Sequence, residues 1–435
     1  MRKMRKGMAL LLAGCMIAGL SACGGSSAPA TTAAPAATEA PKETAAAETK
    51  AEETKAEETK AEETKAEETK AEETKAAEGG VQAAEGEIHI GLVNPLSGDN
   101  ALYGVDQQRA MTMAFEEINA AGGVNGANLV LVEYDDQGDP QNTARGAQKM
   151  ADDESIVAMV GSSLTSCTLA LVPIIDDAGL VDCVVSSSSP SLANASDYFF
   201  RMAVQDAQVG PQMAKAILNK GYKDILVLFS NNDYGKNLGG NLVTYAKENG
   251  GNIVDEIEYN AADQDFSAIV TKVKSAGAEA IAICGTVTDS SLLISQMDQQ
   301  GVDAYIIGAT SLYNTHALEI AGEALEGVGC VSVYISTNPD PKVQEFVKKY
   351  QDKYNETPDA FAAMGYDMAY VLAAAADKAM QANGGEVDRE GMKTGMEQTD
   401  YEGVTGHVVF TEANEWERDY LTLIVKDGEF ILDEN

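Results

Sequence analysis

Short apolar runs alternate with amphipathic segments through most of the chain. In the first half of this pattern the apolar runs fall at 88–93, 110–118, 129–132, 144–150, 156–160, 169–175 and 181–185. Met111, Phe115 and Ile118 recur at helical spacing, whereas 225–229 and 280–283 are continuous runs typical of buried strands. The alternation predicts βαβ units with parallel sheets, and a second series from 224 to 307 predicts two open sheets instead of one.

The pattern continues to the C-terminus. It predicts helices at 341–354 and 361–381 and strands at 406–410 and 420–425. The segment EANEWERD between these strands predicts a hairpin, and we expect its Trp416 to lie at the surface.

Hydroxyl-rich loops follow the predicted strands. They read GLVNPLSGDNALYG at 91–104, GSSLTS at 161–166 and SSSSPSL at 186–192. Ligands bind at the carboxyl ends of parallel strands, where loops meet helix N-termini, and such loops supply neutral donors for a small carboxylate. Capping of helices and shaping of turns is the alternative role for any one of these residues. Asp135, Asp136 and Asp139 lack the spacing of a calcium loop and predict a turn that caps the next helix.

The first 23 residues are typical of a lipoprotein signal peptide. A basic start is followed by an apolar run at 8–20, which is too short to span a bilayer, and then by Leu-Ser-Ala-Cys with Cys23 last. We expect cleavage before Cys23 and lipidation of its thiol, which would anchor the exported protein to the outer face of the cytoplasmic membrane. An ordinary cleaved signal is the alternative.

Residues 24–86 form a low-complexity, charged segment in which AEETK occurs five times over 51–75. A five-residue period places no apolar stripe on one helix face, so this segment cannot join a core. We expect a solvated, partly helical tether that holds the folded part away from the membrane. Binding to a cell-wall polymer is the alternative.

The net charge of −37 excludes two classes of partner. Nucleic acids and anionic membrane surfaces would both be repelled. The first 23 residues contribute +4 and residues 24–86 contribute −8 (7 Lys, 15 Glu), which leaves −33 for residues 87–435. The acidity therefore belongs to the predicted folded part.

Neither a metal site nor a catalytic centre is indicated. The six cysteines include no C-x-x-C pair and none lies near a histidine. Outside Cys15 and Cys23 they are Cys167, Cys183, Cys284 and Cys330, whose pairing the sequence leaves open. The chain contains no G-x-x-x-x-G-K, G-x-S-x-G or H-E-x-x-H motif, so we expect no enzyme and no cofactor.

Several segments together resemble a known family. They are NPLSGDNALYG, the stretch 114–144, the serine-rich loops, FFRMAVQD at 199–206, SNNDYGKN at 230–237 and DFSAIVTKVKSAGAEAI at 265–281. In this order they resemble the branched-chain amino-acid-binding proteins (Leu/Ile/Val-binding type), which are type I periplasmic binding proteins of ABC transporters. The resemblance covers nearly all of 87–435.

The resemblance implies an α/β fold of two Rossmann-like lobes with parallel sheets, joined by a three-stranded hinge and closing on a ligand between them. The first lobe would comprise 87–205 plus 334–408, and the second 206–333 plus 409–435.

The resemblance also implies the ligand contacts. Thr165, or Ser166 if the register shifts by one, would hold an amino-acid carboxylate. Ser186 and Ser188 would offer a carbonyl and a hydroxyl, and the aromatic walls would be Tyr103 and Tyr234.

Two positions of the second lobe depart from the family pattern. Thr310 in GATSLYN stands where leucine-binding relatives place an acid for the ammonium group, and Thr286 in CGTVTD replaces an aromatic residue. Since a buried ammonium group needs a counter-charge, Asp206, Asp233 or Asp289 serves instead, or the ligand is not a simple α-amino acid. Asp206 has an alternative role as a helix N-cap. The first-lobe disulfide of many relatives is also absent, because Gly138 stands at one of its positions; Cys167 could pair with Cys183 or both could stay free.

The expected function is that of an extracytoplasmic solute receptor of an ABC importer. It would bind a small amino acid, first of all a branched-chain one, and dock on the permease subunits. A lipid-anchored sensory or adhesive receptor of the same fold, and a receptor for another small carboxylate or amide, are the alternatives.

Overall fold

The computed structural model describes residues 86–434. The predicted signal peptide, Cys23 and all but the last residue of the predicted tether lie outside the described residues. Among residues 86–434 no helix combines the length and the apolar character needed to cross a membrane.

The first sheet is parallel throughout. Its strands are β1 (Glu87–Asn94), β2 (Asn128–Asp135), β3 (Ile156–Gly161), β4 (Val181–Val184) and β5 (Phe199–Arg201). They are ordered β2-β1-β3-β4-β5, and each neighbouring pair runs in the same direction. The prediction of βαβ units is confirmed for this half of the chain.

The second sheet is mixed. Its strands are β6 (Asp224–Ser230), β7 (Asn252–Tyr259), β8 (Ala280–Cys284), β9 (Tyr305–Gly308), β10 (Gly329–Ser332), β13 (Leu421–Lys426) and β14 (Glu429–Leu432). The order is β14-β13-β10-β9-β8-β6-β7, with β13 and β14 antiparallel at one edge. We call the parts built around the two sheets the first and the second lobe.

Eleven α-helices occur in the described residues. They are α1 (Ala101–Ala120), α2 (Pro140–Asp152), α3 (Thr165–Ala178), α4 (Asp206–Asn219), α5 (Asp233–Glu248), α6 (Ser267–Ala276), α7 (Val287–Gln299), α8 (Thr315–Ala321), α9 (Pro341–Tyr354), α10 (Ala360–Ala382) and α11 (Arg389–Glu397). The remaining short elements are η1 (Pro190–Leu192), η2 (Thr310–Leu312), η3 (Gly322–Leu325) and the antiparallel pair β11 (Tyr401–Gly403) and β12 (Gly406–Val408).

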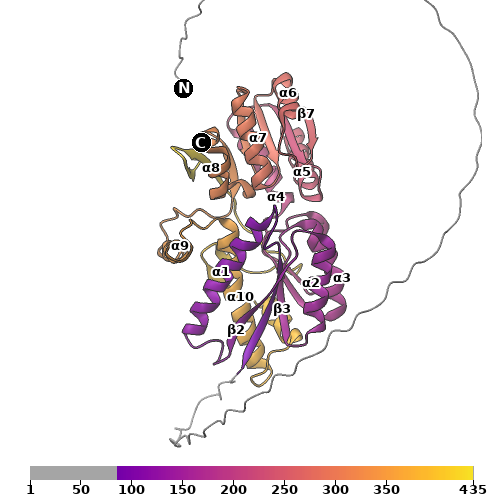
Figure 1. The fold of residues 1–435 in the computed structure, drawn as a ribbon, viewed down its shortest axis with the longest axis vertical. Helices are drawn as coiled ribbons and strands as arrows, with labels where there is room; N and C mark the ends of the chain where they lie inside the picture. The colour runs from indigo at the N-terminus through magenta and orange to yellow at the C-terminus, as the bar shows by residue number, and fades with distance from the viewer. Residues whose placement is uncertain (1–85, 435) are drawn as a thin grey trace, which may run out of the picture. The chain divides into compact units, whose positions relative to one another are not determined.

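The alternation of side chains along β1 explains why both faces of the first sheet are covered. Ile88, Ile90 and Leu92 belong to the apolar cluster that contains residues of α1 and α10. Val93 points to the other face and belongs to the cluster formed with α2 and α3. Figure 1 shows α1 and α10 on one side of this sheet and α2 and α3 on the other. Buried on both faces, the strands read as continuous apolar runs.

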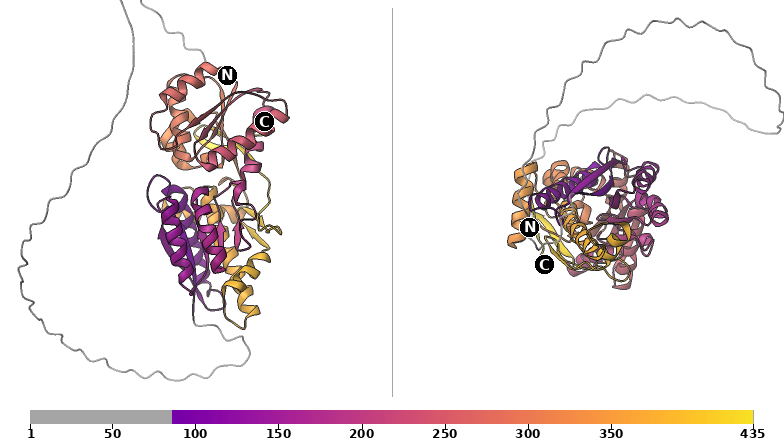
Figure 2. Two further views of the ribbon diagram at one scale, coloured as in Figure 1. Left: turned by 90° about the vertical axis from the view of Figure 1, so that its right-hand side faces the viewer. Right: turned by 90° about the horizontal axis from the view of Figure 1, so that it is seen from below.

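The chain passes between the lobes at three places. It leaves β5 for α4, it leaves β10 for α9, which packs on α1 through Lys349–Glu117, and it leaves β12 for β13. The C-terminal strands, yellow in Figure 2, lie in the second lobe although the gold helix α11 before them contacts β3 of the first. The exact boundaries at 205, 333 and 408 stay predictions.

A buried ion pair joins the first and third of these passages. Arg201, at the end of β5, donates from Nε to a Glu415 carboxylate oxygen at 2.6 Å and from a terminal nitrogen to the other oxygen. The Arg201 side chain is 1% exposed, and Gln205 donates to the same carboxylate at 3.1 Å. Bidentate pairing fixes both partners in orientation as well as in distance.

The predicted hairpin around Trp416 is confirmed, but its predicted surface position is wrong. Phe410 and Trp416 form an antiparallel bridge, and Trp416 is 3% exposed. Its indole N–H donates to the His407 carbonyl at 2.9 Å, and the Arg418 guanidinium lies over the ring at 3.9 Å. Trp416 belongs to the third passage, and its backbone N–H donates to the Arg201 carbonyl of the first passage at 3.0 Å. This contact with a distant segment is one that the local pattern does not reveal.

The four cysteines in the described residues are free and buried. Cys167 and Cys183 do not pair in this structure. Of the two alternatives that the sequence left open, a disulfide bridge and free thiols, the structure has free thiols. Burial raises the pKa of the Cys167 thiol to about 11, which makes it a poor nucleophile.

The ion pair predicts a large effect of a nearly isosteric change. Glu415→Gln leaves the Arg201 guanidinium buried without its counter-charge, so we expect a loss of about 3 kcal/mol in the free energy of unfolding, measured with urea. Glu417→Gln, which changes an exposed carboxylate two residues away, is the control. Equal stability of the two variants would contradict this role of Glu415.

Candidate ligand-binding site

A cavity of about 480 Å³ lies where loops of both lobes meet. The first lobe contributes Asp99, Asn100, Tyr103, residues 163–166, Ser186, Ser188 and Phe361. The second lobe and the passage before it contribute Val204, Asp206, Val209, residues 232–234, residues 260–262, Gln264, Thr286, Thr288, Thr310 and Ser311. All nine residues predicted for the site line this cavity: Tyr103, Thr165, Ser166, Ser186, Ser188, Asp206, Tyr234, Thr286 and Thr310.

Asp206 is the buried acid of the cavity. Its side chain is 1% exposed, and neither carboxylate oxygen has a hydrogen-bond partner. Burial raises the pKa of this carboxyl to about 7, and the nearby Ser188 hydroxyl and Arg201 guanidinium act in the opposite direction. The alternative role as an N-cap is wrong, because Gln205 holds that position of α4 and no side chain caps the helix.

The other two candidate acids differ from Asp206. Asp233 lines the cavity but is exposed. Asp289 is not among the lining residues, and its carboxylate accepts hydrogen bonds from Thr286 at 2.7 Å and Tyr259 at 2.9 Å. Asp206 is therefore the one of the three that lines the cavity as a buried carboxylate without a partner.

Several helices begin at the cavity without a side-chain N-cap. No N-cap side chain bonds to α1, α3, α4 or α7, although α5, which also begins there, is capped by Asn232. The first N–H of α4 donates to the Ser188 carbonyl at 3.0 Å, and that of α7 donates to the Tyr103 hydroxyl at 2.9 Å. By contrast α2, α9, α10 and α11 are capped by aspartates, and Asp139 caps α2 as predicted. Thr165 and Ser166 are the first two residues of α3, so their N–H groups lack partners within the helix and suit an anion.

Two hydroxyl groups of the cavity share the unpartnered state of Asp206. The Oγ atom of Ser188 and the Oγ1 atom of Thr310 are buried and make no hydrogen bond. Ser186 differs, because its hydroxyl donates to the Ser163 carbonyl at 3.1 Å and accepts from Gln107 at 3.1 Å. Leaving a buried polar group unpaired costs about 1–3 kcal/mol, so such groups indicate a place for a ligand atom.

Tyr103 connects the lobes across the cavity. Its hydroxyl oxygen accepts a hydrogen bond from the N–H of Val287, the first residue of α7, at 2.9 Å. Its ring meets Phe361 edge to face at 5.2 Å. Nearby, Asn237 of α5 donates to the Ser189 hydroxyl at 2.9 Å. The predicted aromatic wall thus also ties α1 to the second lobe.

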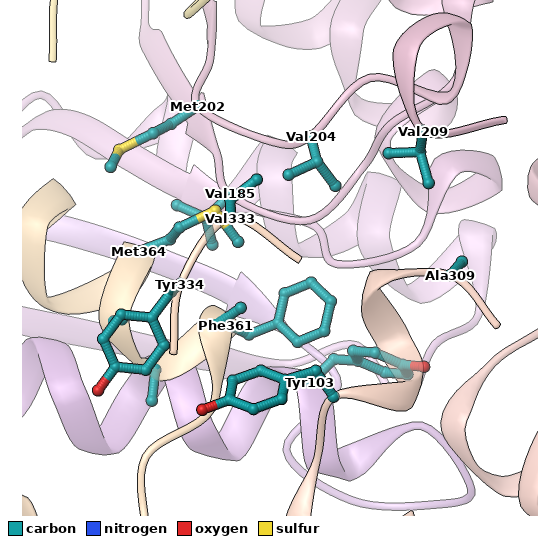
Figure 3. Packing of buried hydrophobic residues seen from close by; sticks show 14 of the residues in the cluster. Tyr103, Val185, Met202, Val204, Val209, Ala309, Val333, Tyr334, Phe361 and Met364 are labelled. Carbon is teal, nitrogen blue, oxygen red and sulfur yellow. The ribbon is translucent and has the colours of Figure 1, made fainter. Parts of the chain in front are cut away.

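Several lining residues were missed by sequence reasoning. Phe361, Val204 and Val209 belong to the same buried apolar cluster as Tyr103 (Figure 3). Gln107 does not line the cavity but supports its wall, because its amide donates to the hydroxyls of the lining residues Ser163 and Ser186, each at 3.1 Å. Gln107 could have been found, since it follows Tyr103 by four residues and so shares its helix face. Phe361 begins a helix far along the chain and carries no such signal.

The cavity offers no cationic side chain. Among its lining residues there is no Lys, Arg or His, whereas Asp99, Asp206 and Asp233 are acidic. An anionic group of a ligand must therefore be held by neutral hydroxyl, amide or backbone N–H donors. For a cationic group, Asp206 is the buried acid of the lining, since Asp99 and Asp233 are exposed. This arrangement fits a small molecule that carries both charges.

The chain belongs to the periplasmic binding protein family, whose model matches residues 87–429. It is 31% identical over 328 residues to the leucine-, isoleucine-, valine-, threonine-, and alanine-binding protein of Pseudomonas aeruginosa, covering 75% of this chain and 86% of that protein. Among solved structures, the branched-chain amino acid transporter substrate binding protein LivJ of Streptococcus pneumoniae, in complex with isoleucine, has a TM-score of 0.73 at 27% identity and covers 79% of this chain and 97% of its own. The leucine binding protein LivK of Thermotoga maritima has a TM-score of 0.72 at 26% identity, with 80% and 97% covered. The fold is therefore that of the type I periplasmic binding proteins, as predicted.

The raised pKa predicts that Asp206 destabilises the ligand-free protein at high pH. Because the folded pKa is about 7 and the ordinary value is 3.8, the folded state holds the proton more tightly. The associated stability is full below pH 3.8 and is lost as the pH rises through about 7. We expect Asp206→Asn to gain stability over the wild type by an amount that grows by roughly 2–3 kcal/mol from pH 5 to pH 8, measured by urea unfolding.

Asp233→Asn is the control for this measurement, since it neutralises an exposed carboxylate at the same cavity. It should show no gain that depends on pH. A gain for Asp206→Asn that is equal at pH 5 and pH 8 would contradict the assignment of the buried charge to Asp206.

Proposed function

We propose that the protein is the extracytoplasmic solute receptor of an ABC importer and that it holds a small L-α-amino acid between its lobes. The observation that carries the proposal is that one cavity presents both an unpartnered buried carboxylate, Asp206, and the uncapped N-terminus of α3. These are the complements of the two charges of an amino acid.

In this proposal the ligand carboxylate accepts hydrogen bonds from the N–H groups and hydroxyls of Thr165 and Ser166. The ammonium group pairs with Asp206 and donates to the Ser186 carbonyl or the Ser188 hydroxyl. Tyr103 and Tyr234 flank the ligand. Burial destabilises the ionised form of Asp206, and pairing with the ligand ammonium group stabilises it again. Ligand binding and ionisation of Asp206 are therefore coupled.

Lobe closure would let the permease distinguish the ligand-bound receptor from the empty one. A ligand that contacts α3 of one lobe and α4 of the other stabilises the closed arrangement, and permease subunits can recognise surfaces that only this arrangement brings together. The function is therefore binding and presentation, with no reaction catalysed. Branched-chain amino acids are the first ligands to test, because the relatives are named for them.

A second candidate is a receptor for a small carboxylate or amide without an ammonium group. It is favoured by the pKa of Asp206 near 7, since a protonated carboxyl could donate a hydrogen bond to such a ligand. The two candidates predict opposite responses to pH.

For an amino-acid ligand, we expect calorimetric affinity to rise with pH and to level off above about 7, because the ammonium group requires ionised Asp206. Between pH 8 and pH 5.5 the affinity should fall roughly 10- to 30-fold. Asp206→Asn should bind about 100-fold more weakly at pH 8 and lose this dependence. The control Asp233→Asn should keep it. Affinity that increases toward low pH would favour the second candidate, and failure of every amino acid to bind would refute the first.

We further propose that Cys23 carries the lipid that anchors the protein at the membrane surface, with residues 24–86 as the tether. The support is the sequence Leu-Ser-Ala-Cys after a short apolar run. Two or more acyl chains give stable anchoring where one is marginal.

A labelling experiment tests the anchor. In bacteria fed an alkyne fatty acid, the full chain should be labelled and should sediment with membranes. Cys23→Ala should lose the label, whereas Cys15→Ala, which changes a thiol within the signal, should keep it. Label that persists in Cys23→Ala would place the lipid elsewhere.

A further inference from the structure

The second-lobe wall of the cavity is polar. Among its lining residues are Asn232, Asn260, Gln264, Thr286, Thr288, Thr310 and Ser311. Apart from Val209 on α4, this lobe contributes no branched aliphatic side chain to the lining. The other apolar groups of this wall are Ala261, Ala262 and the Tyr234 ring. An aliphatic ligand side chain pointing toward the wall would therefore meet hydroxyl and amide groups beside a small apolar surface.

Most of the polar groups near Thr310 are already paired. The Ser311 hydroxyl donates to the Gly285 carbonyl at 2.8 Å, and the Thr286 hydroxyl donates to Asp289 at 2.7 Å. Thr310, at the start of η2 after β9, is 2% exposed, and its Oγ1 atom has no partner. A hydroxyl can both donate and accept, and because Thr310 lines the cavity, a group of a bound ligand is the candidate partner for it.

Three residues of the cavity, Asp206, Ser188 and Thr310, have buried polar atoms without partners, and an amino acid with an aliphatic side chain cannot pair all of them. The proposed function uses Asp206 for the ammonium group and accounts for Ser188 beside it. It leaves the Thr310 hydroxyl unpaired if the ligand ends in an aliphatic side chain, which is the unfavourable outcome for a buried polar group. A ligand with one more hydrogen-bonding group removes this cost.

We propose that the preferred ligand is an amino acid whose side chain carries a hydroxyl or a carboxamide, and that Thr310 recognises this group. The inference rests on the proposed function, since it takes the amino-acid pose as given. Thr310 then determines specificity, because a site built to hydrogen-bond one group rejects an isostere that lacks it.

Threonine and valine provide the sharpest comparison, since they have the same shape and differ in one hydroxyl. For the wild-type protein we expect calorimetric affinity for L-threonine to exceed that for L-valine by about 10-fold or more. Thr310→Val removes the hydroxyl from the protein and keeps the shape of the side chain. It should weaken threonine binding, strengthen valine binding and bring the two affinities within about threefold.

Thr288→Val is the matched control. Thr288 lines the same wall but is only half-buried, so water can replace a lost partner and the preference for threonine should remain. Circular dichroism and thermal unfolding of each variant establish that it is folded. The affinities for L-serine and L-alanine repeat the comparison with a smaller pair of ligands.

The outcomes separate the two proposals. Wild-type protein that binds valine as tightly as threonine overturns the role of Thr310 and leaves amino-acid binding intact. Equal weakening of threonine and valine by Thr310→Val also overturns it, because the hydroxyl then contacts groups common to both ligands. Absence of binding by any amino acid removes the proposed function and this inference together.

Discussion

The ion pair between Arg201 and Glu415 is the contact on which the placement of the site depends. It joins the end of β5 to the passage that leads into β13, two segments more than 200 residues apart in sequence. Gln205 donates to the same carboxylate, and the next residue opens α4. The position of Asp206 is therefore fixed by the hinge and not by either lobe alone.

The same pair explains how the Asp206 carboxylate can lack a partner in the cavity although a cationic side chain lies near it. Arg201 is the cation near Asp206, but its guanidinium donates to Glu415 and to the Ser189 carbonyl, so it lowers the pKa of Asp206 only in part. Were Arg201 free, it would neutralise Asp206 and close the site to a cationic ligand. By satisfying the arginine elsewhere, the hinge keeps the carboxylate available.

Much of the site could be predicted from the sequence, because parallel strands end at a common edge. Thr165, Ser186 and Tyr103 follow different strands of one sheet, so loop position alone placed them together. What could not be predicted depends on contacts between distant segments. The choice of Asp206 over Asp289 required knowing that Tyr259 and Thr286 already bind the latter. The burial of Trp416, whose N–H donates to the Arg201 carbonyl, and the presence of Phe361, which packs on Tyr103, likewise depend on contacts between segments far apart in the chain.

The uncapped start of α3 has a consequence for the empty receptor. When no solute is present, the N–H groups of Thr165 and Ser166 still need acceptors, and water can supply them. Water reaches them most freely when the lobes separate, so solvent acts as a competitor that holds the receptor open. A solute that replaces this water removes the competition, so the loaded and the empty molecule differ in which arrangement of the lobes is favoured.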